Sequence, residues 1–160
     1  MDLKFSAEDE AYRQSLRAWL KENLGRRPDP PPAASKDPLA GARDWPRRLH
    51  EAGYLGLAWP REYGGQEASF TQQVICAEEM ARMRTPPLIN TIGLSIIGPT
   101  LVQHGTEQQK QRFLLRILRA DDLWCQGFSE PAAGSDLASL HCRAEIDGDE
   151  FVVNGQKVWT

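Results

Sequence analysis

Residues 105–128 read GTEQQKQRFLLRILRADDLWCQGF, and the character of the chain changes within this stretch. Thr106 and Gln109 form a capping-box pattern, which predicts the start of a helix. An apolar stripe at helical spacing follows it: Phe113, Leu114, Ile117 and Leu118. The helix is expected to end near Ala120, because the pattern from Leu123 onward is short and aromatic, as in a strand. The sequence therefore predicts a mainly α chain in which helices precede residue 123 and strands follow it.

Four further helices are predicted upstream, where apolar residues recur at helical spacing between glycine and proline breaks. They cover about Ser6–Leu24, Asp44–Ala52, Ser69–Met83 and Leu88–His104. Between the first two, the stretch Pro28–Pro32 is expected to form a loop with polyproline character. Together with the helix after Thr106, these elements indicate a bundle-like helical domain over residues 1–122.

Two of these helices carry expectations about burial. In Ser69–Met83, Glu78 and Glu79 are expected to form a solvated face. The helix Leu88–His104 carries apolar residues around most of its circumference, so we expect it to be buried. In Ser69–Met83, the stripe expected to line the core consists of Phe70, Val74, Ala77 and Ala81.

The last part of the chain, residues 123–160, is interpreted as the beginning of a β-domain. The strands predicted there are Leu140–Ile146, Glu150–Val153 and Lys157–Thr160. Turn sequences separate them, Asp147-Gly148-Asp149 and Asn154-Gly155. Since two or three strands are marginally stable by themselves, we expect the chain to be truncated and this domain to be incomplete.

Composition argues against several classes of function. The 160 residues are 41% hydrophobic, which is enough for a core, and 19 Lys and Arg against 22 Asp and Glu leave no basic excess for nucleic acid. No apolar run is long enough to span a membrane or to act as a secretory signal, so a cytoplasmic location is expected. The spacing of Cys76, Cys125 and Cys142 suits free buried thiols, and no metal site is predicted.

The stretch Trp124–Asp136 is the part of the sequence that can carry chemistry. It is expected to deliver a strand into a turn that contains Pro131 and Gly134. There the hydroxyls of Ser129 and Ser135 can donate hydrogen bonds, which suits a flat ring rich in carbonyl groups, or a phosphate. A turn that only satisfies its own backbone explains the same residues, so the residues alone leave both interpretations open.

Four motifs occur in the order found in acyl-CoA dehydrogenases, and the chain resembles that family over nearly all of its length. They are Gly56-Leu57-x-x-Pro60-x-x-Tyr63-Gly64-Gly65, Gly105-Thr106-Glu107-Gln108-Gln109-Lys110, Cys125-Gln126-Gly127-Phe128-Ser129-Glu130-Pro131-x-x-Gly134-Ser135-Asp136 and Asn154-Gly155-Gln156-Lys157-Val158-Trp159. The resemblance implies the N-terminal helical domain of that family, followed over residues 123–160 by the first strands of its middle β-barrel domain.

The resemblance also implies a site for FAD. Backbone groups and one hydroxyl would contact the isoalloxazine ring, the hydroxyl of Ser135 would bind the pyrophosphate, and Trp159 would pack against the ring. Thr160 is the weaker candidate, because it lies one position before the place where the family has a flavin-bonding Thr or Ser. Gly134 and Ser135 would also line the route of the acyl-CoA thioester. The implied flavin contacts are Gln126, Phe128, Ser129, Gly134, Ser135, Trp159 and Thr160.

For the substrate, the resemblance implies an acyl pocket with one wall formed by the helix Leu88–His104. An ordinary core helix explains the same apolar residues. The small residues Gly93, Ser95 and Gly98 are expected to leave room for a bulky acyl group. The candidate substrate contacts on this helix are Ile92, Leu94, Ser95 and Ile96.

The reaction of the family is α,β-desaturation of an acyl-CoA, in which a glutamate removes the α proton and the β hydrogen leaves as hydride to the flavin. That glutamate would lie beyond residue 160, so no catalytic residue is expected here and the 160 residues alone are expected to be inactive. Glu130 is interpreted as a turn or surface carboxylate.

Two alternatives stay open, a non-catalytic or partner-dependent assembly subunit and a related flavin oxidase or monooxygenase. The implied partners are an acyl-CoA and electron-transferring flavoprotein, and the implied assembly is a homo- or hetero-oligomer, either a dimer or a tetramer.

Overall fold

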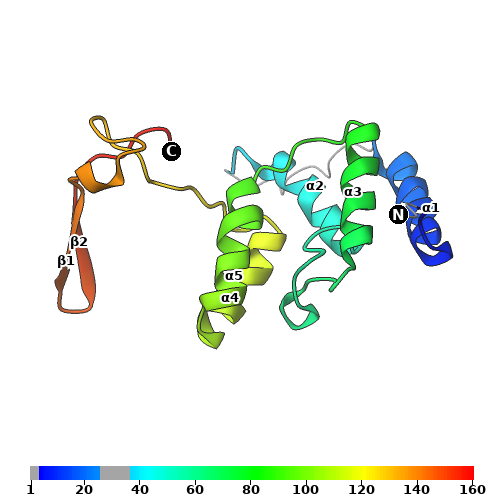
Figure 1. Ribbon diagram of the computed structural model, residues 1–160, viewed down its shortest axis with the longest axis horizontal. Helices are drawn as coiled ribbons and strands as arrows, with labels where there is room; N and C mark the ends of the chain where they lie inside the picture. Colours follow the sequence, from blue (N-terminus) through cyan, green and yellow to red (C-terminus); the bar gives the residue numbers. More distant parts are fainter. Residues whose placement is uncertain (1–3, 26–36) are drawn as a thin grey trace. The chain divides into compact units, whose positions relative to one another are not determined.

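The computed structural model describes residues 4–25 and 37–160 (Figure 1). The predicted loop Pro28–Pro32 lies outside the described residues. The chain divides into two units, residues 1–124, which hold the α-helices, and residues 125–160, which hold a β-hairpin. The structure is therefore mainly α with the beginning of a β-domain, which confirms the predicted fold class.

Three of the α-helices described in the first unit begin at a side-chain cap. Each cap is a capping box, with Ser6 and Asp9, Ser69 and Gln72, and Thr106 and Gln109 each exchanging two hydrogen bonds. One helix begins four residues earlier than predicted, and Pro46 inside it gives up one backbone hydrogen bond. The α-helices are α1 (Ala7–Asn23), α2 (Ala40–Glu51), α3 (Phe70–Arg82), α4 (Gly98–His104) and α5 (Glu107–Leu118).

A single apolar core joins these helices. The predicted stripes of α1, α2 and α5 are confirmed, since each of these helices contributes buried apolar residues at helical spacing. The loop after α2 adds Leu55 and Trp59, and the ring of Trp59 lies against Gly98 at the start of α4. The buried members of this core are Leu16, Leu20, Trp45, Leu49, Leu55, Trp59, Cys76, Leu114, Ile117 and Leu118.

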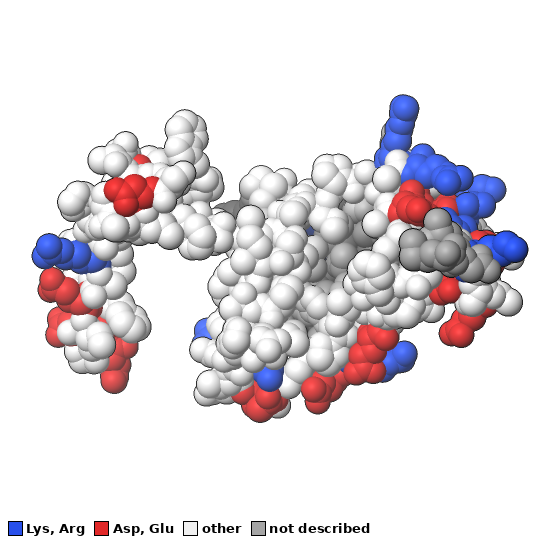
Figure 2. Space-filling view, in the orientation of Figure 1, with Lys and Arg blue, Asp and Glu red and all other residues white. Residues whose placement is uncertain are grey.

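The predicted orientation of α3 is wrong. Phe70 is 79% exposed and Ala77 and Ala81 also face solvent, whereas Glu79 is fully buried. The cause lies in α1, which packs against α3 and whose two arginines pair with Glu79. Figure 2 shows a largely uncharged surface across the middle of the first unit in this view.

The predicted helix Leu88–His104 is shorter and less buried than expected. Helical structure begins at Thr91, and its first part, η2 (Gly93–Ile97), is wound as a π-helix. The two buried glycines of this helix lie against other residues of the unit. A Cβ on Gly93 would collide with the amide of Asn90, and one on Gly98 would collide with the ring of Trp59. Because backbone rather than side chain fills this part of the core, bulkier residues such as Ile96 are turned toward solvent.

The second unit contains the hairpin of β1 (Arg143–Asp147) and β2 (Glu150–Asn154), which pair in antiparallel register. Asp147 pairs with Glu150, so the turn consists of Gly148 and Asp149, and Gly148 has the positive φ that such a turn requires. The first predicted turn is thus confirmed. Within residues 125–160, the predicted strand Lys157–Thr160 and the strand expected before Ser129 are absent, since neither has a ladder partner.

None of the helices in the described ranges combines the length and the apolar character that crossing a membrane requires. The three cysteines carry no disulfide. Cys76 is buried, and this burial raises the pKa of its thiol to about 11. Cys125 is exposed, which corrects the expectation that all three thiols are buried.

Candidate functional site

A tight turn forms the centre of the conspicuous stretch Trp124–Asp136. The backbone amide of Glu130 donates to the carbonyl of Ala133 at 2.8 Å, and the amide of Ala133 donates back to the carbonyl of Glu130 at 3.1 Å. Pro131, with its fixed φ, lies at the corner of this turn. After it, the carboxylate of Asp136 accepts from the amide of Ala138 and starts the short 3₁₀ turn η3 (Leu137–Ser139). The turn therefore does satisfy part of its own backbone.

The side chain of Glu130 holds this turn in place through its hydrogen bonds. Glu130 is only 7% exposed, and its carboxylate accepts hydrogen bonds from the amides of His141, at 2.7 Å, and Cys142, at 2.9 Å. The ammonium group of Lys157 is the third donor, at 2.9 Å. Led by the bond from His141, these donors lower the pKa of Glu130 to about 2.

This environment corrects one expectation and supports another. Glu130 belongs to the turn, as expected, but it is not a surface carboxylate. A carboxylate with so low a pKa is a weak proton acceptor near neutral pH, so its surroundings do not suit a general base. Its three donors instead make it the point at which three segments of the second unit meet.

Lys157 and Val158 bring the end of the chain next to the turn. Lys157 also donates to the carbonyl of Phe128 at 3.0 Å, and the amide of Val158 donates to the carbonyl of Ser129 at 2.9 Å. These bonds replace the predicted strand Lys157–Thr160. Two motifs that lie about thirty residues apart in the sequence are thus adjacent, and Trp159 follows directly after the contact with Ser129.

Near this contact, aromatic side chains are exposed and several hydrogen-bond donors of the described residues are unpaired, so both can bind a ligand. The side chain of Trp159 is 93% exposed and that of Phe128 is 62% exposed. Within the described part of the chain, the hydroxyl of Ser129 and the backbone amides of Gln126 and Phe128 donate no hydrogen bond. Exposed aromatic rings beside unsatisfied donors are what a flat heterocycle with carbonyl and ring-nitrogen acceptors needs, so the residues present fit the isoalloxazine of FAD.

The remaining flavin candidates lie in the same unit but take no part in the contact between Ser129 and Val158. Gln126 and Ser129 are half-buried, whereas Gly134, Ser135 and Thr160 are exposed. A Cβ on Gly134 would meet no atom within 4 Å, so the backbone there is open to approach. The Ser135 hydroxyl has no hydrogen-bond partner among the residues described.

The candidate substrate contacts belong to the first unit and divide between two faces of their helix. Leu94 lines an apolar cavity of about 370 Å³, together with Trp59, Met80 and other residues of α3 and the loop after α2. Ile92 is half-buried, while Ser95 and Ile96 face solvent and the Ser95 hydroxyl donates to the carbonyl of Thr91. The space beside Gly93 is occupied by the amide of Asn90, and the space beside Gly98 is occupied by the ring of Trp59. These two glycines therefore do not leave the expected room for an acyl group.

Sequence reasoning missed the structural roles of Glu130 and Lys157. Their opposite charges occur in the two motifs that flank the hairpin, and that pairing of charges is the only signal that could have indicated the ion pair. The sequence does not predict this salt bridge, because two charges about thirty residues apart follow no sequence period.

A family profile and curated relatives that match this chain are described as acyl-CoA dehydrogenases. The profile described as "Acyl-CoA dehydrogenase, N-terminal domain" matches residues 6–121. Over 156 residues the chain is 45% identical to the acyl-CoA dehydrogenase IpdE1 of Mycobacterium tuberculosis, and the match covers 94% of this chain and 40% of that protein.

Two solved structures resemble the fold along the whole chain. The ChsE4-ChsE5 complex from Mycobacterium tuberculosis matches with a TM-score of 0.77 and 35% identity, over 100% of this chain and 40% of the matched one. The Tcur3481-Tcur3483 steroid ACAD matches with a TM-score of 0.76 and 36% identity, over 100% of this chain and 41% of the matched one. The 160 residues therefore span about two fifths of the length of these relatives.

Proposed function

Because the chain belongs to the acyl-CoA dehydrogenase family, we propose that it is the N-terminal portion of a flavin-dependent enzyme that desaturates an acyl-CoA thioester between its α and β carbons. Bound FAD would accept the β hydrogen as hydride. The α proton would go to a glutamate beyond residue 160, since the low pKa of the buried glutamates described here makes them weak proton acceptors. In this proposal residues 1–122 are the helical domain and residues 123–160 begin the middle domain.

The observation that carries this proposal is the contact between Ser129 and Val158. It joins the segment of Gln126, Phe128 and Ser129, whose amides and hydroxyl are unsatisfied, to the exposed ring of Trp159. In the proposed site the donors bind the isoalloxazine ring and the indole packs on it, which also restricts water. Further along the turn, Ser135 binds the pyrophosphate, Gly134 lets the thioester approach, and Thr160 is an additional flavin contact.

For the substrate we propose an acyl-CoA with a large, steroid-derived acyl group. The support is the likeness to the Tcur3481-Tcur3483 steroid ACAD and the apolar cavity that contains Leu94. In this proposal Ile92, Ser95 and Ile96, which the described residues leave partly or fully exposed, face the acyl group along the same helix. Steroid side chains fall within lipid catabolism, a role that fits a cytoplasmic location.

The proposal is tested by anaerobic reduction of the flavin in the full-length protein. Purified protein with FAD is mixed with a steroid side-chain acyl-CoA, isovaleryl-CoA or a short straight-chain acyl-CoA, and the absorbance of the oxidised flavin is followed. We expect bleaching, fastest with the steroid thioester. No bleaching with any of the three would refute the dehydrogenase assignment, and equal rates would refute the steroid preference. The 160-residue chain alone is expected to bind FAD weakly and to reduce none.

A matched pair of serine variants tests the proposed flavin contact. Ser129→Ala removes a free hydroxyl beside Trp159, whereas Ser139→Ala removes a hydroxyl that donates to the carbonyl of Asp136 in the same unit. Loss of one hydrogen bond should weaken FAD binding by about three- to tenfold in Ser129→Ala. Titration of apoprotein with FAD, followed by flavin fluorescence, measures this. Equal affinities for the two variants would contradict the assignment of Ser129.

The electron acceptor and the assembly are part of the same proposal. Both matched structures are named for two chains, so we propose that this chain also assembles with a different chain, with electron-transferring flavoprotein as the oxidant. Peroxide formation after reduction, in place of electron transfer to that flavoprotein, would indicate the oxidase or monooxygenase alternative. Flavin bound only after a partner chain is added would indicate the assembly-subunit alternative.

A further inference from the structure

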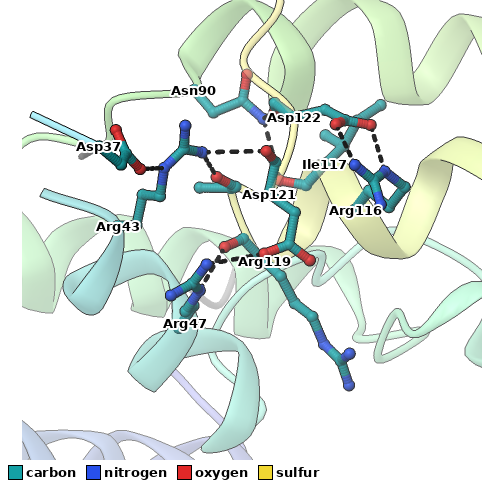
Figure 3. A network of polar contacts seen from close by, with 10 residues as sticks. Asp37, Arg43, Arg47, Asn90, Arg116, Ile117, Arg119, Asp121 and Asp122 are labelled. Carbon is teal, nitrogen blue, oxygen red and sulfur yellow. Dashed lines mark hydrogen bonds and ion pairs between the residues drawn. The ribbon is translucent and has the colours of Figure 1, made fainter. Parts of the chain in front are cut away.

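Residues 119–124 directly follow α5, and we call these six residues the exit segment. Side chains from two other parts of the chain hold them in place (Figure 3). From α2, Arg43 donates to the carbonyls of Ala120 and Asp121, and Arg47 donates to the carbonyl of Arg119 at 3.3 Å. Ala120 has a φ of 53°, in the left-handed region that commonly ends a helix. Two arginines of α2 therefore bind the carbonyls of the residues that directly follow α5.

Asn90 also holds the exit segment. Its side-chain amide donates to the carbonyls of Ile117, at 3.0 Å, and Asp122, at 2.9 Å, and its oxygen accepts from the amide of Trp124 at 3.1 Å. Asn90 is 1% exposed, and these three bonds use both of its N–H donors and one of the two acceptor sites on its oxygen. All three partners belong to α5 or the exit segment.

The chain around Asn90 is shaped to admit this amide. Gly93 lies against it so closely that a Cβ would be 2.6 Å from its nitrogen, and the π-helical winding of η2 begins at Gly93. Single π-turns of this kind are commonly retained where a side chain must be placed with accuracy. Trp124 is fixed further by an edge-to-face contact with Phe113, with ring centroids 5.4 Å apart.

Asn90 thus lies next in sequence to the proposed acyl contacts, and it binds a residue that lies next in sequence to the proposed flavin contacts. Ile92 and Leu94, the first proposed acyl contacts, follow it in the helix that begins at Thr91. Trp124, whose amide it binds, precedes Gln126 and Phe128, the first proposed flavin contacts, by two and four residues. We propose that Asn90 is a positioning residue, which fixes the end of the first unit, at Trp124, against the start of the acyl-lining helix through one buried amide.

This inference rests on the proposed function and is tested in the full-length protein with Asn90→Asp. The aspartate has nearly the same shape but cannot donate to the carbonyls of Ile117 and Asp122. We expect the rate of flavin reduction at saturating acyl-CoA to fall at least about tenfold, because small displacements of reacting groups are costly, while the FAD content stays near one per chain. The half-saturating acyl-CoA concentration should change much less than the rate.

Glu79→Gln is the matched control, since it also alters one buried polar side chain without changing its shape and does not touch the exit segment. It should lower the melting temperature while keeping the reduction rate within about twofold of wild type. If the rates of both variants fall in proportion to their stability, Asn90 is only structural and the inference is wrong. An unchanged rate in Asn90→Asp refutes it as well.

A milder variant keeps the test decisive if Asn90→Asp does not fold. Arg47 is half exposed and binds the exit segment through Arg119 and Asp121, so Arg47→Ala should lower the rate about two- to threefold, whereas Arg61→Ala, at another exposed ion pair, should not. Equal rates in these two variants would refute the inference. Failure of the wild-type protein to reduce its flavin would instead refute the proposed function, and the inference with it.

Discussion

Glu79 and Glu130 show how a residue's surroundings decide its role. Glu79 was expected on a solvated face and Glu130 was interpreted as a turn or surface carboxylate, and both are buried. Arg17 and Arg13 of α1 lower the pKa of Glu79 to about 2, and the amide of His141, with Lys157 and the amide of Cys142, does the same for Glu130. In each case the partners are distant in sequence, so the local pattern of the helix or turn could not reveal them.

The low pKa of Glu130 predicts a dependence on pH. Because this pKa in the folded chain lies below the ordinary glutamate value of about 4.3, the ionised form is favoured by folding. Its contribution to stability is complete above that ordinary value and is lost as the pH falls through about 2. The amide proton shifts of His141 and Cys142, followed by NMR, should therefore titrate with a midpoint near pH 2.

Two variants check the origin of this titration. In Glu130→Gln the titration of both amides should disappear, since an amide side chain does not ionise in this range. The same substitution at the exposed Glu145 of β1 should leave it unchanged. A midpoint near pH 4.3 in the wild-type chain would show that Glu130 is not held by these donors.

At the scale of elements, the helix that runs from Thr91 through η2 to α4 departs most from its pattern. Its apolar residues predicted burial on all sides, but its buried positions are the two glycines, while Ile97 is only partly buried and Ile96 is exposed. Gly98 allows the helix backbone to lie on the ring of Trp59, and Gly93 allows it to lie on the amide of Asn90. The packing thus depends on the absence of side chains at two positions, which a hydrophobic pattern does not record.

Gly98→Ala tests this close packing. The added methyl group would overlap the ring of Trp59, which is itself 6% exposed and has no room to turn away. We expect the free energy of unfolding to fall by about 1–3 kcal/mol, as for other overpacked cores. Urea denaturation followed by far-ultraviolet circular dichroism measures this change.

Gly41→Ala is the control for that substitution. Gly41 lies in α2 with no atom within 4 Å of the added group, so alanine should stabilise the helix by up to about 1 kcal/mol. A loss of stability at Gly98 no larger than the effect at Gly41 would mean that Trp59 does not pack on the helix as described.

At the scale of the whole molecule, the two units differ in what holds them together. The first has an apolar core formed by α1, α2, α3 and α5 with the loop after α2. In the second, the buried residues among those described are Glu130 and Ala133, and every residue of β1 and β2 is exposed. Polar bonds around Glu130, rather than apolar burial, therefore maintain the turn on which the proposed flavin site is built.

This difference predicts that the 160-residue chain unfolds in two steps. A two-stranded hairpin without a core is marginally stable, so the second unit should lose its structure at lower urea concentration than the helices. Amide exchange of residues 143–154 and helical circular dichroism, measured on the same samples, should give separate midpoints. Coincident midpoints would show that the two units unfold as one.

The sequence by itself determined the features that depend on neighbours a few residues away. Capping boxes placed the starts of α1, α3 and α5, the Gly148-Asp149 turn placed the hairpin, and four motifs identified the family. Such signals are local because backbone donors near a helix start or a turn are satisfied within one turn of chain.

Only the tertiary structure decided which groups from distant segments meet. It buried Glu79 against α1, placed Lys157 and Val158 against the turn at Glu130, and set Asn90 against the exit segment. It also left Lys157–Thr160 without the strand partner that the pattern required. Hydrogen bonds and ion pairs across tens of residues obey no sequence period, so these contacts, which define the candidate site, could be read only from the fold.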